Sequence, residues 1–516
     1  MAESWVNYAE RIGSDLHLEL SGPGSRRAVL ITALRDAVRN GRLAPGTRLP
    51  PYRSLAADLG VARNTVADAY AELVAEGWLT ARQGSGTHVA ERTRPLPVAV
   101  PPKAHARAPH APPHDGPVRH DLRQGTPDAS SFPRSAWLAS YRRALHQAPN
   151  EVFGPGDPAG RPELRAALAD YLARARGVRT EPNRIVVCSG FAHALRLLFG
   201  PGTGSRSESR VGSTGESAGA GANTGGDGDR VGGPVRGGRI LRGPLAVEAY
   251  GLPFHRELLA AAGVRTVPLP LDEHGARVDR LGRERAVLLT PAHQFPTGGP
   301  LHAERRAGVV DWARARGAVV LEDDYDGEFR YDRKPVGALQ SLDPERVILI
   351  GSVSKSLSPA VRLGWMVLPE RYVGGVLAAK GEREAWASVL DQLALADLIA
   401  SGAYDRHVRR MRQRYRSRRD RLVAALAEHA PHIEVGGVAA GLHAVLRLPP
   451  GTERSAVESA VRHGVGLDGL AGFRHPDTDM PAHDGLVVGY ATPPEHAYGA
   501  ALEALCAVLA PGGLPL

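Results

Sequence analysis

Between residues 160 and 370 short apolar runs alternate with helical patterns, and this alternation narrows the possible folds more than any other feature. Buried strands are predicted at 185–188, 245–248, 265–268, 286–289, 319–322, 347–350 and 364–368. Helical patterns such as 162–176 and 303–316 lie between them. Strands that alternate with helices form a mostly parallel sheet covered on both faces, so we expect an α/β domain here.

The first 90 residues follow a different pattern. Apolar spacing predicts helices over 25–40, 54–59 and 63–76, each followed by a glycine that suits a helix end. Short strands are predicted at 79–82 and 87–89, around the sequence Gly-Ser-Gly. Helices followed by a two-stranded wing are typical of a winged helix-turn-helix, which presents its third helix to the major groove of DNA.

Polar residues at the helix starts and in the wing can form hydrogen bonds with the edges of DNA bases and with phosphates. A guanidinium, an amide and a hydroxyl open the third helix, and an arginine opens the second, where helix N–H groups also favour a phosphate. The predicted DNA-binding residues are Arg53, Arg63, Asn64, Thr65, Ser85 and Thr87. Helical spacing alone leaves a small dimerisation domain as an alternative.

Length and charge set limits on the rest of the chain. At 516 residues two or three domains are expected. The net charge is +9, yet residues 1–90 hold 10 arginines and 9 acidic residues, so DNA contacts there depend on placement. Two cysteines predict neither disulfides nor a metal cluster and suit the cytoplasm. No secretory signal or membrane span is expected.

Two segments lack an apolar period. Residues 91–118 are rich in proline and histidine and are predicted to be an extended linker. Residues 201–237 are about one-third glycine and are predicted to be a disordered insertion. We therefore expect a DNA-binding domain at 1–90, the linker at 91–118 and a second domain at 119–516.

A lysine in the second domain follows a predicted strand. Lys355 comes after 347–350, and hydroxyls at Ser352 and Ser354 and the guanidinium of Arg362 are groups that bind phosphate. A lysine that forms a Schiff base needs such a partly desolvated strand end beside a positioned cofactor. An isolated lysine is more often a surface residue, so the prediction depends on its neighbours.

Acidic and hydroxyl groups are expected at the same sheet edge. Asp323 follows 319–322 and can hold a pyridinium N–H, and Tyr325 can donate to a phenolate oxygen. Ser189 and Gly190, after 185–188, form another strand-to-helix turn suited to phosphate. The ends of parallel strands meet at one crevice, so we expect these groups to converge.

Residues 25–90 resemble the winged helix-turn-helix of the GntR regulators. The resemblance rests on LAADLGV, RNTV, AYAELVAEGWL and GSGTHV. Ala62 stands where that family usually has a capping serine, and loss of such a cap costs about 1 kcal/mol.

Residues from about 120 to 516 resemble the aspartate-aminotransferase-like proteins that bind pyridoxal phosphate (PLP), on the motifs EDDYD, TPAHQFPTG and GSVSK. With the front domain, the chain resembles a MocR-type regulator. The resemblance implies a multidomain chain whose second domain has the fold type I PLP-dependent transferase fold, with a small C-terminal α+β subdomain. It implies that Lys355 forms the Schiff base with PLP, within the cofactor-binding set Ser189, Gly190, Phe191, Asp323, Tyr325, Ser352, Ser354, Lys355 and Arg362.

Three departures affect groups that aminotransferases use around the cofactor and substrate. Phe295 replaces an asparagine before Pro-Thr-Gly, and Leu486 replaces the arginine that binds the substrate carboxylate. The aromatic residue that stacks on the cofactor falls near Leu252, where Tyr250 or Phe254 is expected to replace it. Loss of a bidentate clamp favours sensing over turnover of amino acids.

Nine arginines lie between positions 406 and 421 on a predicted helix. The simpler interpretation is a solvated helix with partners four residues away. The alternative is an auxiliary contact with DNA or with the DNA-binding domain.

These features favour a PLP-dependent transcriptional regulator that acts as a cytoplasmic homodimer on repeated DNA half-sites. Its effector is expected to be PLP, or an amine or amino acid that reacts with it. The alternatives are an active PLP-dependent aminotransferase that carries a DNA-binding domain, and a DNA-binding protein whose second domain only dimerises it.

Overall fold

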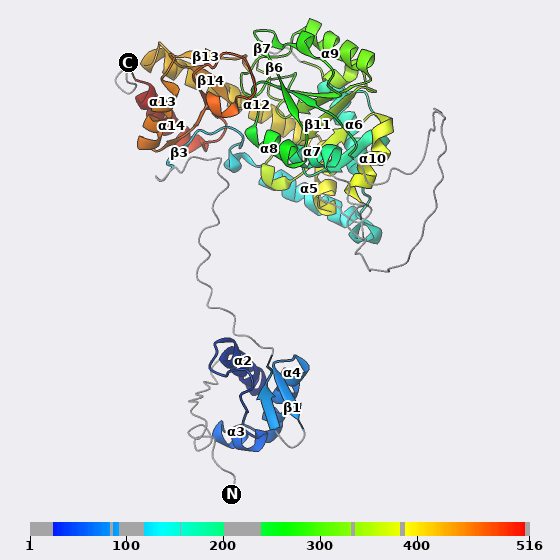
Figure 1. The fold of residues 1–516 in the computed structure, drawn as a ribbon, viewed down its shortest axis with the longest axis vertical. Coiled ribbons are helices and arrows are strands. Elements are labelled where there is room, and N and C mark those ends of the chain that lie inside the picture. Colours follow the sequence, from blue (N-terminus) through cyan, green and yellow to red (C-terminus); the bar gives the residue numbers. More distant parts are fainter. Residues whose placement is uncertain are drawn as a thin grey trace, which may run out of the picture. The chain divides into compact units, whose positions relative to one another are not determined.

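A computed structural model describes residues 24–82, 86–91, 118–154, 156–200, 239–331, 336–381 and 387–510. The chain divides into two compact units, Met1–Pro113 and His114–Leu516 (Figure 1). Nearly all of the predicted linker and the whole predicted insertion at 201–237 lie outside the described residues. No described helix is long and apolar enough to span a membrane.

The N-terminal unit is a three-helix cluster with a hairpin, formed by α2 (Arg26–Arg39), α3 (Tyr52–Asp58), α4 (Arg63–Ala75), β1 (Leu79–Arg82) and β2 (Gly86–Val89). Its core holds Leu30 and Leu34 of α2 against Val66 and Leu73 of α4. Helix α3 begins two residues before its predicted start, directly after Pro51. The winged helix-turn-helix predicted from the sequence is confirmed.

A seven-stranded sheet forms the centre of the larger unit. Its order is β4-β12-β11-β10-β9-β5-β6, and only β12 runs antiparallel to its neighbours among these strands. The strands are β4 (Ile185–Cys188), β5 (Leu245–Glu248), β6 (Thr266–Leu269), β9 (Ala286–Leu289), β10 (Val319–Asp324), β11 (Val347–Ser352) and β12 (Gly364–Val367). Strands β10 and β11 run two residues past their predicted ends, which carries Asp323 and Ser352 within the sheet.

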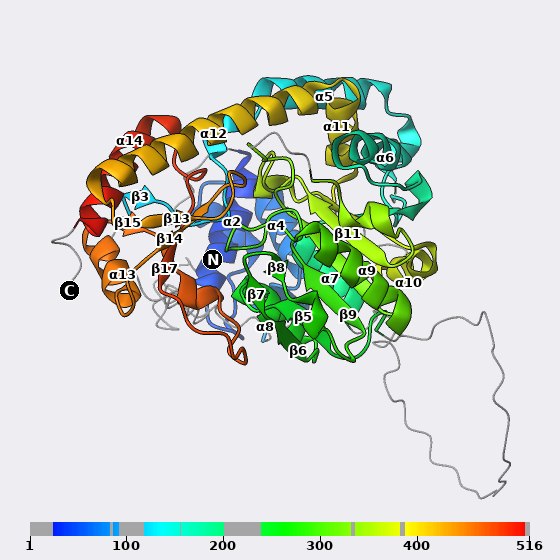
Figure 2. The ribbon, with the colours of Figure 1, turned by 90° about the horizontal axis from the view of Figure 1, so that it is seen from above.

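Helices cover both faces of this sheet, as predicted (Figure 2). On one face α7 (Phe191–Phe199), α8 (Pro253–Ala261) and α10 (Glu370–Lys380) share a core with the strands. On the other face lie α6 (Pro162–Arg176), α9 (Ala303–Arg316) and α11 (Val389–Ala400), which packs against α5 (Arg134–Gln147).

A smaller α+β part follows at the C-terminal end, as expected. It contains α12 (Ala403–His429), α13 (Glu453–Arg462), α14 (Glu495–Leu509) and the antiparallel strands β13 (Glu434–Gly436), β14 (Ala444–Arg447), β17 (Gly485–Val488) and β16 (Asp468–Gly469). The segment that enters the larger unit joins this part, because β3 (His120–Asp121) pairs with β15 (Val465–Gly466). Two further short strands, β7 (Leu271–Asp272) and β8 (Gly275–Ala276), form a hairpin.

The arginines of α12 are not simply a solvated face. Arg418 is 1% exposed and contacts Asp128 at 3.1 Å and Glu495 at 2.9 Å. Arg414 contacts the same two acids, and Nε of Arg412 donates to a backbone carbonyl. The solvated interpretation is wrong for these three residues, which fasten α12 to distant segments of its own unit.

Candidate functional site

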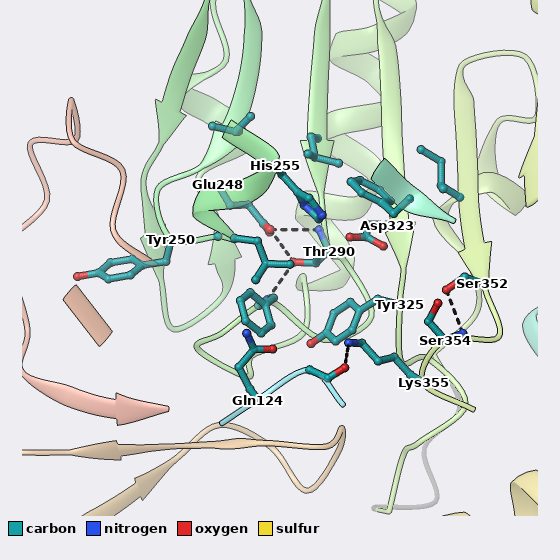
Figure 3. Close-up of a pocket in the computed structure, with 18 of the residues that line it drawn as sticks. Gln124, Glu248, Tyr250, His255, Thr290, Asp323, Tyr325, Ser352, Ser354 and Lys355 are labelled. Carbon is teal, nitrogen blue, oxygen red and sulfur yellow. Dashed lines mark hydrogen bonds between the residues drawn. The ribbon is translucent and has the colours of Figure 1, made fainter. Parts of the chain in front are cut away.

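A cavity opens at the carboxyl ends of β5, β9, β10 and β11 (Figure 3). Of the predicted cofactor residues it is lined by Phe191, Asp323, Tyr325, Ser352, Ser354 and Lys355. Asp323, Tyr325 and Lys355 point into this shared space in Figure 3. The structure therefore brings Lys355 together with Tyr325 and Asp323, which lie 30 and 32 positions before it in the sequence.

Lys355 lies on the turn that follows β11. Its Nζ donates a hydrogen bond to the backbone carbonyl of Gly125, in the segment that enters the larger unit. Burial lowers the pKa of Lys355, while the nearby carboxylates of Asp326 and Asp323 act in the opposite direction. A lysine with a lowered pKa is neutral more often, and the neutral amine is the form that attacks an aldehyde.

Asp323 is a buried carboxyl group in the wall of the cavity. It lies opposite Ile350 in the register of β10 and β11 and is 9% exposed. Burial raises the pKa of Asp323 well above its ordinary value, and the negative charges of Asp324 and Asp326 add to this. A cation or N–H donor in the cavity would therefore stabilise its charged form.

Tyr325 belongs to a buried polar network. Its hydroxyl lies 2.9 Å from Nδ1 of His293, and the same Nδ1 lies 2.8 Å from a carboxylate oxygen of Asp326. Burial raises the pKa of Tyr325 well above its ordinary value, and the charge of Asp326 reinforces this. The phenol is thus held neutral, as a hydrogen-bond donor.

The predicted phosphate-binding residues come from three adjoining chain segments. Ser352 pairs with Gly364 in the sheet, and Gly364 pairs with Cys188, which precedes Ser189. A Cβ on Gly364 would lie only 2.7 Å from Cα of Gly190, so only glycine allows this approach. Ser189, Gly190 and Arg362 lie at this edge without lining the cavity, and Arg362 is the one non-glycine residue with positive φ among the described residues.

The expected replacement for the stacking aromatic residue is not found where the sequence suggested. Of the two alternatives, Phe254 is wrong, because it is 53% exposed and does not line the cavity. Tyr250 lines the cavity, but its ring is turned away from the cavity centre in Figure 3. The aromatic wall is instead formed by Phe191 and His255, whose ring centres are 4.6 Å apart. Burial lowers the pKa of His255 to about 4, so its ring is neutral near pH 7.

Of the two apolar replacements that the sequence suggested, Phe295 faces the cavity and Leu486 does not. Phe295 lines the cavity, with its ring centre 5.9 Å from that of Tyr325 and 5.0 Å from that of His443. Leu486 on β17 is fully buried in the core of the C-terminal part. Neither residue offers a donor to a carboxylate.

Several cavity residues were not predicted. Gln124 and Gly125 follow β3, and His443 precedes β14, so they reach the cavity from segments far from the lysine motif. Glu248, at the end of β5, accepts from the hydroxyl of Thr290 at 2.6 Å, and burial raises its pKa to about 7. In the sequence, the one feature that could have identified this pair is its place in the sheet. Glu248 ends β5 and Thr290 directly follows β9, and both strands end at the same edge.

The predicted DNA-binding residues lie at the surface of the N-terminal unit. Arg53, Arg63 and Asn64 are exposed, and Thr65 and Thr87 are half-buried. Ser85 lies outside the described residues. Arg48 was not predicted, and its guanidinium would lie 3.2 Å from a Cβ on Gly86 in the wing. No side chain caps α4 at Ala62, as the sequence departure implied.

Comparison with known proteins matches both units. Residues 27–89 match the gntR family of bacterial regulatory proteins, and residues 245–467 match aminotransferase class I and II. The pyridoxine biosynthesis transcriptional regulator PdxR of Corynebacterium glutamicum is 32% identical, over 91% of this chain and 92% of that protein. The probable rhizopine catabolism regulatory protein MocR of Rhizobium meliloti is 31% identical, over 90% of this chain and 89% of its own length. The chain belongs to the MocR/PdxR-type transcriptional regulators.

The larger unit of this regulator has the fold of an enzyme. An archaeal alanine:glyoxylate aminotransferase superposes with a TM-score of 0.62 over 76% of this chain and 90% of the enzyme, at 21% identity. At that identity the likeness establishes the fold alone. The family membership favours regulation over the alternative of an active aminotransferase.

Proposed function

We propose that this regulator binds promoter DNA through its N-terminal unit and captures PLP at Lys355, and that PLP alters the DNA-bound state. The single observation that carries the proposal is the convergence of Asp323, Tyr325 and Lys355 in one cavity of a chain that also has a GntR unit. Attached to a lysine, PLP supplies an electron-withdrawing ring, but a sensor needs only its capture.

The groups in the cavity fit PLP. The carboxylate of Asp323 receives no hydrogen bond from any described residue, and a pyridinium N–H would supply one. Tyr325 would donate to the ring oxygen, and Phe191 and His255 would flank the ring. Ser352 and Ser354, together with Ser189, Gly190 and Arg362 behind them, would hold the phosphate.

The entering segment offers a route from Lys355 toward the DNA-binding unit. Attachment of an aldehyde to Nζ would leave this nitrogen with at most one N–H bond, so we expect its contact with the Gly125 carbonyl to weaken. Three residues later Asp128 is held by Arg414 and Arg418. We therefore expect the change to concentrate between β3 and Asp128, where the chain arrives from the linker.

The names of the relatives suggest which effector this regulator binds and which process it controls. One of them is named as a regulator of pyridoxine biosynthesis, which supports PLP as the effector and vitamin B6 supply as the regulated process. The apolar side chain of Phe295 in the cavity supports an effector that needs no polar partner at this position. We expect a homodimer on repeated half-sites, since one winged unit contacts only a short stretch of the groove.

Footprinting of the DNA upstream of the gene tests the proposal. Wild-type protein should protect repeated half-sites, and added PLP should alter the protection. Lys355→Ala should protect the same DNA and show no response to PLP. Identical footprints with and without PLP in the wild type would contradict the sensing role, and absence of protection would contradict the DNA-binding role.

A further inference from the structure

Behind Tyr325 lies a buried polar cluster from three segments of the larger unit. His293 follows β9, Asp326 follows β10 and His443 precedes β14. The three residues are from 2% to 5% exposed. Only His443 lines the cavity, so His293 and Asp326 reach a bound molecule through Tyr325.

The contacts at Nδ1 of His293 determine where its proton lies. A carboxylate only accepts hydrogen bonds, so the 2.8 Å contact with Asp326 requires a proton on Nδ1. An Nδ1 that carries a proton cannot accept one from the Tyr325 hydroxyl, 2.9 Å away. The phenol proton is therefore free to point elsewhere, either to Asp326 or into the cavity.

Close packing fixes the imidazole in this orientation. A Cβ on Gly441, whose φ is +77°, would lie 2.2 Å from Cε1 of His293 and 2.7 Å from the Asp326 carboxylate. On the other side, Nε2 of His443 donates to the carbonyl of Pro296 at 3.0 Å, and burial lowers the pKa of His443 to about 3. His443 is thus a neutral wall that does not compete for the Asp326 carboxylate.

The cluster lies where the cavity has lost a donor. Phe295 stands at the position of an asparagine in aminotransferases and packs edge-on to Tyr325, with an angle of 89° between the rings. Tyr325 is then the side chain best placed to donate to a ring oxygen. The direction of its hydroxyl proton therefore matters more here than in a site that has a second donor.

We infer that His293, anchored by Asp326, is a positioning residue that directs the Tyr325 hydroxyl proton into the cavity toward the ring oxygen of PLP. The inference rests on the proposed capture of PLP. The charged and titratable groups that surround Tyr325 and the His293–Asp326 contact include Asp323, Glu248, His443, Lys355, Glu328, Tyr331 and Tyr490.

A pH titration of the absorption spectrum of PLP-loaded protein tests this role. A donor to the ring oxygen withdraws electron density and so favours loss of the proton from the lysine-linked nitrogen. Tyr325→Phe should therefore raise the apparent pKa of the spectral transition by about one unit. His293→Leu should raise it in the same direction, because the Tyr325 hydroxyl, which already contacts Asp326, then donates to that carboxylate without competition from Nδ1. His293→Asn, whose amide nitrogen takes the place of Nδ1, should return it toward the wild-type value.

The double variant His293→Leu/Tyr325→Phe distinguishes positioning from general damage. If His293 acts through Tyr325, the double variant should titrate like Tyr325→Phe alone. Exposed His432→Gln is the matched control and should titrate like the wild type. Circular dichroism of each apoprotein checks that it is folded.

The outcomes separate the two proposals. Two results would overturn the role of His293 and leave the proposed function standing. The first is that folded His293→Leu titrates like the wild type. The second is that the shifts of the two single variants add up in the double variant. A wild-type protein that shows no PLP-dependent absorption would overturn the proposed function, and this inference with it. If His293→Leu does not fold, His293→Gln, whose amide nitrogen takes the place of Nε2, must show the upward shift.

Discussion

The two units place their functional residues in opposite environments. In the N-terminal unit Arg53, Arg63 and Asn64 are exposed and contribute nothing to its core. In the larger unit Asp323 is buried and Lys355 is half-buried, and each shifts the pKa of the other, together with Asp326. Because of this difference, substitutions of the DNA-binding residues should have independent effects on DNA binding. Substitutions in the cavity should instead have coupled effects on PLP binding.

The largest expected effect is on PLP binding in the cavity. Asp323→Asn removes the charge that would pair with the pyridinium, and a hydrogen bond to a charged group contributes about 1.5 to 3 kcal/mol. PLP affinity should fall roughly 10- to 100-fold, measured by equilibrium dialysis. Exposed Asp311→Asn is the control. Unchanged affinity in Asp323→Asn would break the comparison, because Asp323 would then be only a structural residue.

A substitution on the DNA-binding side should leave PLP binding intact. Arg63→Ala should weaken binding to the promoter by about 1 to 3 kcal/mol if Arg63 contacts a base, or lower the salt dependence if it contacts a phosphate. Fluorescence anisotropy at two salt concentrations measures both. Arg26→Ala, at an exposed position on α2, should have little effect. Equal losses in the two variants would show that only overall charge matters.

Acid should destabilise the larger unit through two histidines, His255 and His443, whose pKa values are lowered by burial. The folded pKa values of His443 and His255 lie at about 3 and about 4, below the ordinary 6.5. Their contribution to the free energy of unfolding is therefore complete above pH 6.5. It is lost as the pH falls toward 4, because in this range the unfolded chain binds protons and the folded chain does not. Urea unfolding at pH 7.5 and pH 5 should show the loss.

The variant His443→Asn sharpens this prediction. The drop in unfolding free energy between the two pH values should be smaller than in the wild type, whereas exposed His432→Asn should leave it unchanged. Glu248 has the opposite sign, since its pKa is raised to about 7 and its contribution is lost as the pH rises from 4.5 to 7. An equal drop in all three proteins would show that His443 is not buried neutral.

The smallest expected effect tests the missing cap of α4. Ala62→Ser should supply an acceptor for a helix-start N–H and stabilise the N-terminal unit by about 1 kcal/mol. Thermal melting of the full chain, followed by the transition of this unit, measures it. No gain would mean that water already satisfies these N–H groups.

The sequence predicted the fold well where a local signal was strong. Four-residue apolar runs such as Ile185–Cys188 and Ala286–Leu289 are strands with the predicted bounds, because neither face of the sheet meets solvent. The convergence of Asp323, Tyr325 and Lys355 followed from the rule that parallel strands end at one edge.

The remaining features depended on contacts between distant segments. His293 and His443 meet across 150 positions, at ring centres 5.3 Å apart, and nothing local marks them as partners. Phe254 and His255 are neighbours on α8, so about 100° of helix rotation decides which one faces the cavity. The partners of Arg414 and Arg418, Asp128 and Glu495, likewise come from opposite ends of the larger unit.

The most direct test of the central claim is a thermodynamic cycle. Promoter DNA affinity is measured with and without PLP, and PLP affinity with and without DNA, for wild type and Lys355→Ala. Linkage requires the two fold-changes to be equal, so the account predicts one shared coupling factor in the wild type, on the order of 5- to 150-fold, and none in Lys355→Ala. A coupling factor of one in the wild type, with both ligands bound, would contradict the account.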